Sequence, residues 1–410
     1  MAVEIRVVEE EQWADFVRSA FVAFAAAPRP QDVEDSRVEY VPGRSIAAWD
    51  GDRIVGTTSV ISLRMTVPGG AEVPTAGVTT VGVQPTHRRR GILRQMMRRQ
   101  SDDSRGQGYA IAALWASEPA IYQRFGYGMA TRQAAASVPR AHTAWLPSVP
   151  AAEGQVRLIT SDDSAKDLGP VYDRARAETP GMLARSEEWW MYRFRHLDAE
   201  HHRGGFGPMF FALHEGADGP DAYSAYRVKF DDSDGIDRGL VQVVETVTTT
   251  PASVRGIWSY LFGVDLVETI SFWNRPPDDP LFAMAVDLRR FGPKVVDGLW
   301  IRLLDVPAAL SARHYDVEER VVFELRDEFC EWNAGTFELT GGPDGADCVA
   351  SDAAPELTLS MNELGAVYLG GTRLRTLARA GRVEEHTAGA VARADAMFAG
   401  DREPWCPHQF

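Results

Sequence analysis

Residues 78–100 read VTTVGVQPTHRRRGILRQMMRRQ, and this stretch decides the fold. Its first six residues are β-branched valine and threonine around one glycine, a composition typical of a strand. Pro85 cannot donate a backbone hydrogen bond and ends that strand. After three arginines and a glycine, apolar side chains recur at helical spacing. The stretch therefore predicts a buried strand, a tight basic turn over residues 88–91 and an amphipathic helix.

The start of that helix is a predicted binding site for phosphate. The first N–H groups of a helix have no partner within it, and the helix dipole and nearby guanidinium groups favour an anion. Gly91 has no Cβ, so a bulky anion can approach the backbone there. Taken alone, the arginines fit a solvated helix start equally well. The spacing matches neither a Walker loop nor a dinucleotide-binding glycine pattern.

Composition and charge limit the possible functions. A chain of 410 residues with 45% hydrophobic residues is long enough for two or three domains. A net charge of -15 argues against nucleic acid or an anionic membrane as the main partner and suits a cationic substrate. Only three cysteines occur, none in a CxxC pair, which indicates reduced thiols. With no signal peptide or membrane-spanning run in the sequence, we expect a soluble, cytoplasmic protein.

The first third of the chain predicts alternating strands and helices. A helix is expected over residues 11–26, and strands are expected at 3–8, 45–50, 53–66 and 109–115. A short helix should follow, with Ser117 as its N-cap, Pro119 in its first turn and Gly126 at its end. A further strand is expected from Tyr127.

An internal repeat is visible at residues 244–260, which read VETVTTTPASVRGIWSY. Pro251 aligns with Pro85, and Arg255-Gly256 aligns with Arg90-Gly91. The second copy keeps one arginine where the first has three. We interpret this as a duplicated domain whose phosphate loop has decayed. The alternative is that two strand–turn–helix units converged on Pro and Gly for ordinary turn reasons.

From about Val296 the pattern predicts a third, α+β domain. Short strands are expected at 299–303, 319–324, 335–340 and 357–359, and helices at 361–369, 372–380 and 388–398. The acidic stretch 231–237 lacks the ligands of a calcium loop and reads as a hairpin turn. The chain ends PWCPHQF, an aromatic tail that we expect to pack rather than hang loose.

The basic turn resembles the coenzyme A loop of GCN5-related (GNAT) acetyltransferases, whose signature is Arg/Gln-x-x-Gly-x-Gly/Ala. Arg88 and Gly91 match this signature, whereas Leu93 stands where it has Gly or Ala. The segment ASEPAIYQRFGYG at 116–128 and the short aromatic C-terminus add to the match. Over its full length the chain resembles the Eis family of actinobacterial N-acetyltransferases.

The resemblance implies a mixed α/β (α+β) architecture in three domains. Residues 1–150 would form the catalytic acetyltransferase domain and 151–295 a degenerate second copy. Residues 296–410 would form a sterol-carrier-protein-like domain that supplies the C-terminal carboxylate. It also implies a homohexamer, with acetyl-CoA as acyl donor and no metal. The acceptors would be amines of polycationic small molecules such as aminoglycosides, acetylated by direct transfer in a ternary complex.

The resemblance assigns site residues as well. Those expected at the acyl donor follow the strand edge, the basic turn and the next helix start: Val81, Gly82, Val83, Arg89, Arg90, Gly91, Ile92, Leu93, Arg94, Ser117 and Glu118. Tyr122 matches the catalytic tyrosine, a proton donor to the departing thiolate. Phe410 matches the terminal residue whose α-carboxylate acts as base, or equally as an anchor for an ammonium group.

Other interpretations remain open from the residues alone. By spacing, Tyr122 is a packed helix aromatic, and Tyr127 is a rival phenol. Phe410 fits a tail that simply buries its ring. Two rival functions are acetylation of lysine on proteins or peptides, and a non-catalytic role in binding coenzyme A or lipid within an assembly.

Overall fold

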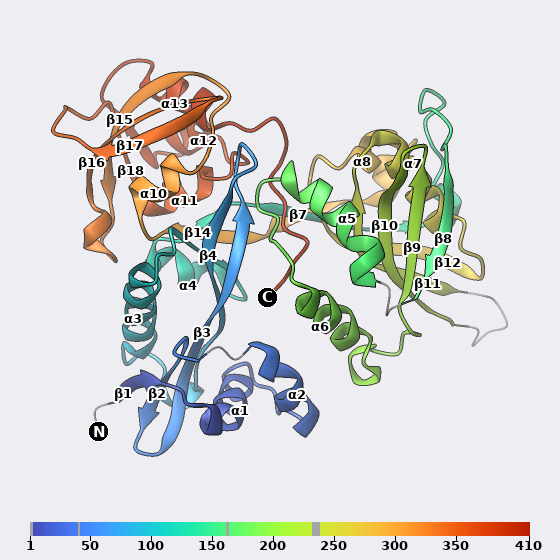
Figure 1. Ribbon diagram of the computed structural model, residues 1–410, viewed down its shortest axis with the longest axis horizontal. Coiled ribbons are helices and arrows are strands. Elements are labelled where there is room, and N and C mark those ends of the chain that lie inside the picture. The colour runs from blue at the N-terminus through green and yellow to red at the C-terminus, as the bar shows by residue number, and fades with distance from the viewer. Residues whose placement is uncertain (1–2, 40–41, 161–163, 232–237) are drawn as a thin grey trace. The chain divides into compact units, whose positions relative to one another are not determined.

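The computed structural model describes residues 3–39, 42–160, 164–231 and 238–410 (Figure 1). The hairpin turn expected at 231–237 therefore lies, except for its first residue, outside the described residues. The chain forms two compact units. The first comprises Met1–Thr131, Leu299–Asp401 and His408–Phe410, and the second comprises Arg132–Gly298 and Arg402–Pro407.

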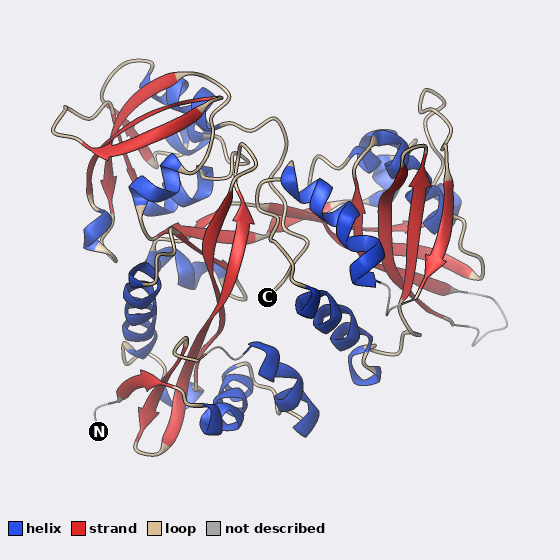
Figure 2. Cartoon of the chain, viewed as in Figure 1, coloured by secondary structure: helices blue, strands red, loops and turns tan. Residues whose placement is uncertain are grey.

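A seven-stranded sheet forms the centre of the first unit, in the order β1-β2-β3-β4-β5-β14-β6 (Figure 2). The strands are β1 (Glu4–Val7), β2 (Ser45–Asp50), β3 (Arg53–Thr66), β4 (Glu72–Val83), β5 (Ile111–Trp115), β6 (Gly128–Met129) and β14 (Leu299–Leu303). Only β4 and β5 run parallel, and the other neighbours are antiparallel. The predicted hairpin of β2 and β3 and the predicted strand ending at Val83 are confirmed.

Helices cover both faces of this sheet. They are η1 (Glu10–Gln12), α1 (Trp13–Ala23), α2 (Pro30–Asp35), η2 (Ser36–Glu39), η3 (Pro85–His87), α3 (Ile92–Gly106), α4 (Pro119–Tyr122) and η4 (Gln123–Phe125). The apolar side chains that predicted α3 are those it buries, with Ile92, Met96 and Met97 almost fully enclosed. The amphipathic helix after the basic turn is therefore confirmed.

The first unit also contains a five-stranded sheet in the order β17-β16-β15-β18-β19. Its strands are β15 (Glu319–Arg326), β16 (Gly335–Gly342), β17 (Gly345–Ala350), β18 (Leu357–Ser360) and β19 (Val383–Glu385). It is accompanied by α10 (Val306–Ser311), η7 (Glu331–Asn333), α11 (Met361–Val367), α12 (Leu374–Arg379) and α13 (Ala390–Phe398). The predicted α+β character of this region is confirmed.

The second unit is built on a seven-stranded sheet in the order β13-β7-β12-β11-β10-β9-β8. Its strands are β7 (Arg132–Pro139), β8 (Gln155–Ile159), β9 (Phe210–Gly216), β10 (Gly219–Lys229), β11 (Gly239–Thr248), β12 (Val267–Arg275) and β13 (Lys294–Asp297). Its helices are η5 (Arg140–His142), α5 (Ser164–Ala177), α6 (Glu187–Asp198), η6 (Glu200–His202), α7 (Pro251–Phe262), α8 (Pro280–Met284) and α9 (Leu288–Phe291). Trp258 and Phe272 lie in its core.

One strand of the first sheet comes from far along the chain. β14 inserts between β5 and β6 and pairs antiparallel with both. β7, which directly follows the first six strands in sequence, pairs instead with β12 and β13 of the second sheet. The first sheet is thus completed by β14, which follows all strands of the second sheet in sequence. The second sheet takes β7, which follows the first six strands of the first sheet. Among the described residues, no helix combines the length and apolar character needed to cross a membrane.

Candidate functional site

β4 and β5 separate partway along their length. Their parallel register joins Thr75–Gly77 to Ile111–Ala113, and within the described residues no strand pairs with the β5-facing edge of β4 beyond Gly77. Pairing with β3 on the other side continues to Val83 after a bulge, where Thr80 has a φ of 51° and its carbonyl accepts a 2.8 Å hydrogen bond from the Thr57 hydroxyl. An open strand edge of this kind can receive a chain that carries amides.

The three residues expected along this edge, Val81, Gly82 and Val83, form the end of β4 and are half-buried. Gly82 also has a structural reason to be glycine. A Cβ placed there would lie 2.7 Å from the Cβ of Ala23, at the end of α1. The close approach of α1 therefore fixes this residue type, whether or not a ligand uses the edge.

The basic turn after β4 has a conformation that favours glycine. Arg89 and Gly91 have φ values of 63° and 77°, in the left-handed region. A non-glycine residue there costs about 1–2 kcal/mol, and such strain is concentrated at functional sites. Gly91 is the N-cap of α3 and offers no side-chain cap, so the N–H groups of Ile92, Leu93 and Arg94 point out of the helix without an internal partner.

The arginines of this turn divide by role. Arg88 donates hydrogen bonds to the carbonyl oxygens of Ala23 and Val83, at 3.1 and 3.3 Å, and so ties the turn to the sheet. Arg89 and Arg90 are exposed, and no hydrogen bond or ion pair to the described part of the chain engages either guanidinium group. The space in front of Gly91 is open, because a Cβ there would meet nothing nearer than Gln95, at 3.9 Å. The turn thus offers two uncommitted cations beside open helix N–H groups.

Tyr122 lies in the core beneath the gap between β4 and β5. Its side chain is 8% exposed and shares a cluster with Val78 of β4 and Leu114 of β5. Burial raises the pKa of Tyr122 to about 12, and the nearby Glu118 carboxylate adds to this. The rival phenol, Tyr127, packs edge-on with its ring centroid 6.0 Å from that of Tyr122. Burial raises the pKa of Tyr127 further, and its side chain is only 1% exposed.

The helix that carries Tyr122 begins one residue later than expected. Its N-cap is Glu118, with no side-chain cap, so the expectation that Ser117 is the N-cap is wrong. Pro119 occupies the first helical position and forces the residue before it out of the helical region, which makes that residue the N-cap. Ser117 and Glu118 are exposed at the end of β5.

The chain terminus is held on both sides of Pro407. In the second unit, the Trp405 indole donates to the Asn274 carbonyl at 2.9 Å, and the Asn274 amide donates to the Cys406 carbonyl at 2.8 Å. In the first unit, the Trp115 indole donates to the His408 carbonyl at 3.1 Å. His408 is fully buried and Phe410 is half-buried. The expectation that the aromatic tail packs is confirmed.

Two residues that the sequence analysis missed hold the turn of Tyr122. The Asn362 side-chain amide donates to the carbonyl oxygens of Gln123 and Tyr127, and Arg302 donates to that of Phe125. Arg302 lies inside the apolar run LWIRL of β14, and a charged residue in such a run indicates a buried, paired side chain. Asn362 gave no local signal, because it lies 235 residues from Tyr127.

The corresponding turn of the second copy has a different structure. α7 begins directly at Pro251, so Arg255 and Gly256 lie inside the helix and not in a loop before it. The guanidinium carbon of Arg255 lies 4.4 Å from the centre of the Trp145 ring. The sequence match of Arg255-Gly256 to Arg90-Gly91 is therefore not a match of structure.

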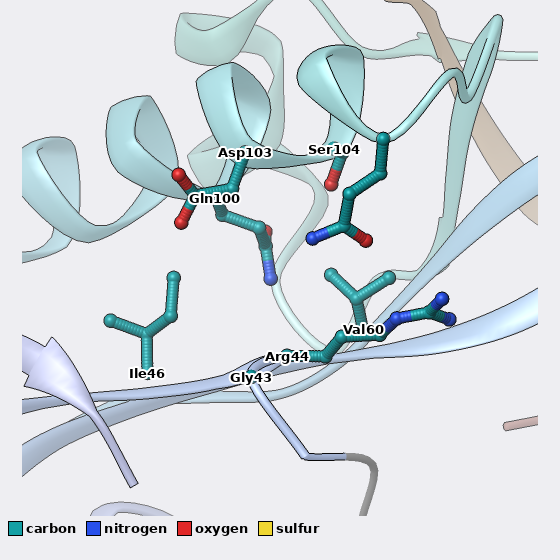
Figure 3. A pocket seen from close by; sticks show the side chains of 8 residues that line it. Gly43, Arg44, Ile46, Val60, Gln100, Asp103 and Ser104 are labelled. Atoms are coloured by element: carbon teal, nitrogen blue, oxygen red, sulfur yellow. The ribbon is translucent and has the colours of Figure 1, made fainter.

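A small cavity lies elsewhere in the first unit, between β2, β3 and the C-terminal half of α3 (Figure 3). Its volume is about 10 Å³, room for about one water molecule. Asp103 and Ser104 line it from α3, Val60 lines it from β3, and Arg44 lines it from the residue before β2. Asp103 is about 18 Å along the helix from Gly91, at 1.5 Å per residue. This cavity is separate from the basic turn.

Family models match three segments of the chain. Residues 4–130 and 181–303 match acetyltransferase (GNAT) domains, and residues 306–407 match a sterol carrier protein domain. The duplication expected from the internal repeat is confirmed by the two acetyltransferase matches. The second match ends with β14, the strand that completes the first sheet.

Whole-chain comparisons agree with these matches. An uncharacterized N-acetyltransferase of Streptomyces avermitilis is 41% identical over 415 residues, covering all of both chains. The N-acetyltransferase Eis of Mycobacterium tuberculosis is 35% identical over 415 residues, covering 98% of each. The crystal structure of Eis1 from Mycobacterium abscessus superposes with a TM-score of 0.85 at 31% identity, covering 99% of this chain and 100% of that one. The chain belongs to the Eis family of N-acetyltransferases.

Proposed function

We propose that the enzyme transfers an acetyl group from acetyl-CoA to primary amines of polycationic small molecules such as aminoglycosides. One observation supports this most directly: an open strand edge on β4 leads into an uncapped helix start flanked by Arg89 and Arg90. Enzymes of this superfamily use acetyl-CoA, whose pantetheine arm carries amides and whose diphosphate carries negative charge. The net charge of -15 suits a cationic acceptor.

Each part of the acyl donor has a proposed partner. The pantetheine amides pair with the backbone of Val81, Gly82 and Val83, as an added strand would. The diphosphate contacts the backbone N–H groups at the start of α3, with Arg89 and Arg90 supplying charge. Ser117 and Glu118 line the same molecule from the end of β5. The full set is Val81, Gly82, Val83, Arg89, Arg90, Gly91, Ile92, Leu93, Arg94, Ser117 and Glu118.

Tyr122 is the proposed hydrogen-bond donor to the departing thiolate. Because burial raises its pKa to about 12, the phenol stays protonated throughout the pH range of an ordinary assay. Full proton transfer to a free thiolate of pKa about 8.5 would then be uphill by about 5 kcal/mol. The phenol is therefore expected to stabilise the developing sulfur charge by a hydrogen bond, with the final proton coming from the amine or water.

Phe410 is proposed to act through its α-carboxylate. A C-terminal carboxylate binds a cationic amine or accepts its proton, either directly or through water. No covalent acyl-enzyme is required, because the amine attacks the thioester directly in a ternary complex. Adding two serines after Phe410 moves the carboxylate and should lower kcat at least tenfold without changing the unfolding temperature. A wild-type rate in that variant would exclude the terminal carboxylate.

The proposed domain roles follow the three-part division of the chain. Residues 1–150 supply the chemistry, 151–295 form the copy without a phosphate loop, and 296–410 supply the carboxylate. We further propose a homohexamer located in the cytoplasm, where the three cysteines, all of them buried, would stay reduced. Sedimentation of the full chain tests the assembly.

The acceptor is tested by a panel that measures release of coenzyme A. Kanamycin and related aminoglycosides are compared with lysine-containing peptides at equal concentrations of reactive amine. The proposal expects turnover with the aminoglycosides to exceed that with the peptides. Faster reaction with the peptides would assign the enzyme to protein acetylation.

A further inference from the structure

The turn that carries Tyr122 is too short to hold its own shape. α4 has four residues and η4 has three, and the chain then reverses at Gly126 with a φ of 77°. Helices of this length are unstable alone. The turn has two backbone hydrogen bonds of its own, from the Gly126 N–H to the Gln123 carbonyl at 3.1 Å and from the Tyr127 N–H to the Tyr122 carbonyl at 3.3 Å. The position of Tyr122 therefore also depends on groups outside the turn that bind its carbonyl oxygens.

Asn362, at the start of α11, binds two of them. Its side-chain nitrogen lies 2.8 Å from the carbonyl oxygen of Gln123 and 2.9 Å from that of Tyr127. Both partners are acceptors only, and a primary amide has two N–H groups, so the contact uses its full donor capacity. Gln123 directly follows Tyr122, and Tyr127 lies four residues further on, so the two carbonyl groups flank the turn and Asn362 closes it like an external C-cap.

The backbone of α11 is fixed against the same segment. A Cβ at Gly128 would lie 2.0 Å from the carbonyl oxygen of Asn362, and one at Gly365 would lie 2.3 Å from the carbonyl oxygen of Ile301. Backbone therefore packs on backbone at β6 and β14, with no side chain between them. This contact leaves Asn362 little freedom to shift relative to the turn.

Arg302 and Asp327 hold a third carbonyl group of this segment. Arg302 donates to the Phe125 carbonyl and forms a fully buried ion pair with Asp327. The Asp327 carboxylate in turn accepts from the backbone N–H groups of Phe329 and Cys330, at 3.1 and 2.9 Å. Asp327 and Asn362 both belong to the segment that matches a sterol carrier protein domain. That domain therefore holds the turn in two places.

We propose that Asn362 is a positioning residue for acetyl transfer. It acts through Tyr122, by fixing the turn that packs this phenol against Val78 of β4 and Leu114 of β5. The sterol-carrier-like domain would thus contribute to catalysis through its fold as well as through the chain terminus. The inference rests on the role proposed for Tyr122.

The test compares Asn362→Ala and Asn362→Asp in the full chain, with acetyl-CoA and kanamycin as substrates. A displacement of a catalytic group by about 1 Å can lower kcat by about a hundredfold, so we expect a fall of roughly 10- to 100-fold for Asn362→Ala. Asn362→Asp keeps the shape but places an oxygen against two carbonyl oxygens, so its kcat should fall at least as far. The Kd for acetyl-CoA, measured by calorimetry, should change less than about twofold.

Two further variants separate positioning from general support. Tyr315→Phe removes a 3.0 Å hydrogen bond to the Leu310 carbonyl, from a side chain that is not part of the cluster around Tyr122, and it should keep the wild-type kcat. In a Tyr122→Phe background, Asn362→Ala should lower kcat no further, because the group that it positions is absent. Thermal unfolding of each variant separates loss of folded protein from loss of rate.

A wild-type kcat for Asn362→Asp would overturn the inference, because shape alone would then suffice. So would an equal loss from Asn362→Ala with and without the Tyr122 hydroxyl. A wild-type rate for Tyr122→Phe itself is a different outcome: it would remove the proposed role of Tyr122, and the inference about Asn362 with it.

Discussion

The starts of α3 and α7 follow the same pattern of strand, proline, arginine and glycine, yet only one is open. α3 begins after Gly91, which caps no N–H group. α7 begins after Thr250, whose hydroxyl accepts from the Ser253 N–H at 3.0 Å, while the Ser253 hydroxyl accepts from the Thr250 N–H at 3.1 Å. The difference teaches that the N-cap residue, more than a nearby arginine or glycine, decides whether a helix start can receive an anion.

A carboxylate adds to the closure of α7. Asp221 accepts a 3.3 Å hydrogen bond from the Thr250 hydroxyl and a 2.6 Å hydrogen bond involving the His214 ring. A Cβ at Gly256 would lie 2.2 Å from the His214 ring, so this glycine makes room for histidine and not for a ligand. The helix start that is proposed to bind phosphate in the first copy thus has a capping box in the second, with a negative charge beside it.

The two copies also use their charges differently. In the first, Arg89 and Arg90 remain exposed at the helix start. In the second, Arg185 and Glu245 form an ion pair with both side chains 1% exposed, and Arg193 lies 3.2 Å from the same carboxylate. Charges that could bind a ligand in one copy hold the fold together in the other.

The largest expected effect tests whether acetyl transfer takes place in the first copy, at Tyr122. Tyr122→Phe should lower kcat by about 10²- to 10³-fold, the usual loss when one hydrogen-bond donor to a developing negative charge is removed. The Kd for acetyl-CoA should hardly change, because the ring and the strand edge remain. Steady-state kinetics with kanamycin and calorimetry with acetyl-CoA measure the two quantities. An unchanged kcat would mean that the phenol does not take part.

The next effect concerns the buried charges of the second copy. Burial alone would raise the pKa of Glu245, but the guanidinium groups of Arg185 and Arg193 outweigh it and hold the pKa at about 2. A carboxylate with a lowered pKa in the folded state stabilises the fold above its unfolded pKa, near 4.3, and that stability is lost as the pH falls toward 2. The contribution is about 3 kcal/mol.

Differential scanning calorimetry from pH 7 to pH 2.5 checks this prediction. The wild type should lose stability steeply below about pH 4.5. Glu245→Gln should be less stable at pH 7, because it leaves two buried guanidinium groups without a carboxylate, and its stability should depend less on pH over this interval. Parallel pH curves for the two proteins would contradict the assignment.

A smaller effect is expected at the basic turn itself. Replacing both Arg89 and Arg90 by alanine should weaken acetyl-CoA binding by roughly 10- to 100-fold, since hydrogen bonds to charged groups contribute about 1.5–3 kcal/mol and these are exposed. The loss should shrink at high salt. Calorimetry at two salt concentrations tests both statements, and an unchanged Kd would place the diphosphate elsewhere.

The smallest effect belongs to the matched residue of the second copy. Arg255→Ala should leave the Kd for acetyl-CoA unchanged, because a capping box closes the start of α7 and Pro251 has no N–H group. It should reduce the unfolding free energy by about 1 kcal/mol through loss of the stacking on Trp145. If this substitution weakened binding as much as those at Arg89 and Arg90, the comparison of the two helix starts would be wrong.

Much of the first domain was predictable because its signals are local. The proline, the glycine and the helical spacing of Ile92 and Met96 together located the basic turn and α3 correctly. The start of α7 has an equally local signal, because Thr250 and Ser253 form a capping box on either side of Pro251, and this places Arg255 and Gly256 inside the helix. Capping residues therefore locate a helix start better than a matching arginine and glycine do.

The rest was not predictable, because it depends on contacts between residues distant in sequence. The residues 299–303 read correctly as a strand, yet nothing in five apolar-rich residues indicates which sheet they join. Nothing in the sequence around Asn362 predicts its two hydrogen bonds, because the carbonyl partners lie 239 and 235 residues away. β4 separates from β5 near a bulge at Thr80, and the residue types around Thr80 do not predict that bulge.

The late arrival of β14 has a consequence for biosynthesis. The ribosome releases Thr131 well before Leu303, and at about 5–20 residues per second the delay is on the order of ten to thirty seconds. Throughout that interval the nascent first sheet has β5 as an unprotected border, next to the strand gap on which acetylation would depend. A newly made chain must therefore wait for most of its translation before it can become active, and shielding of that border by a chaperone would favour its correct completion.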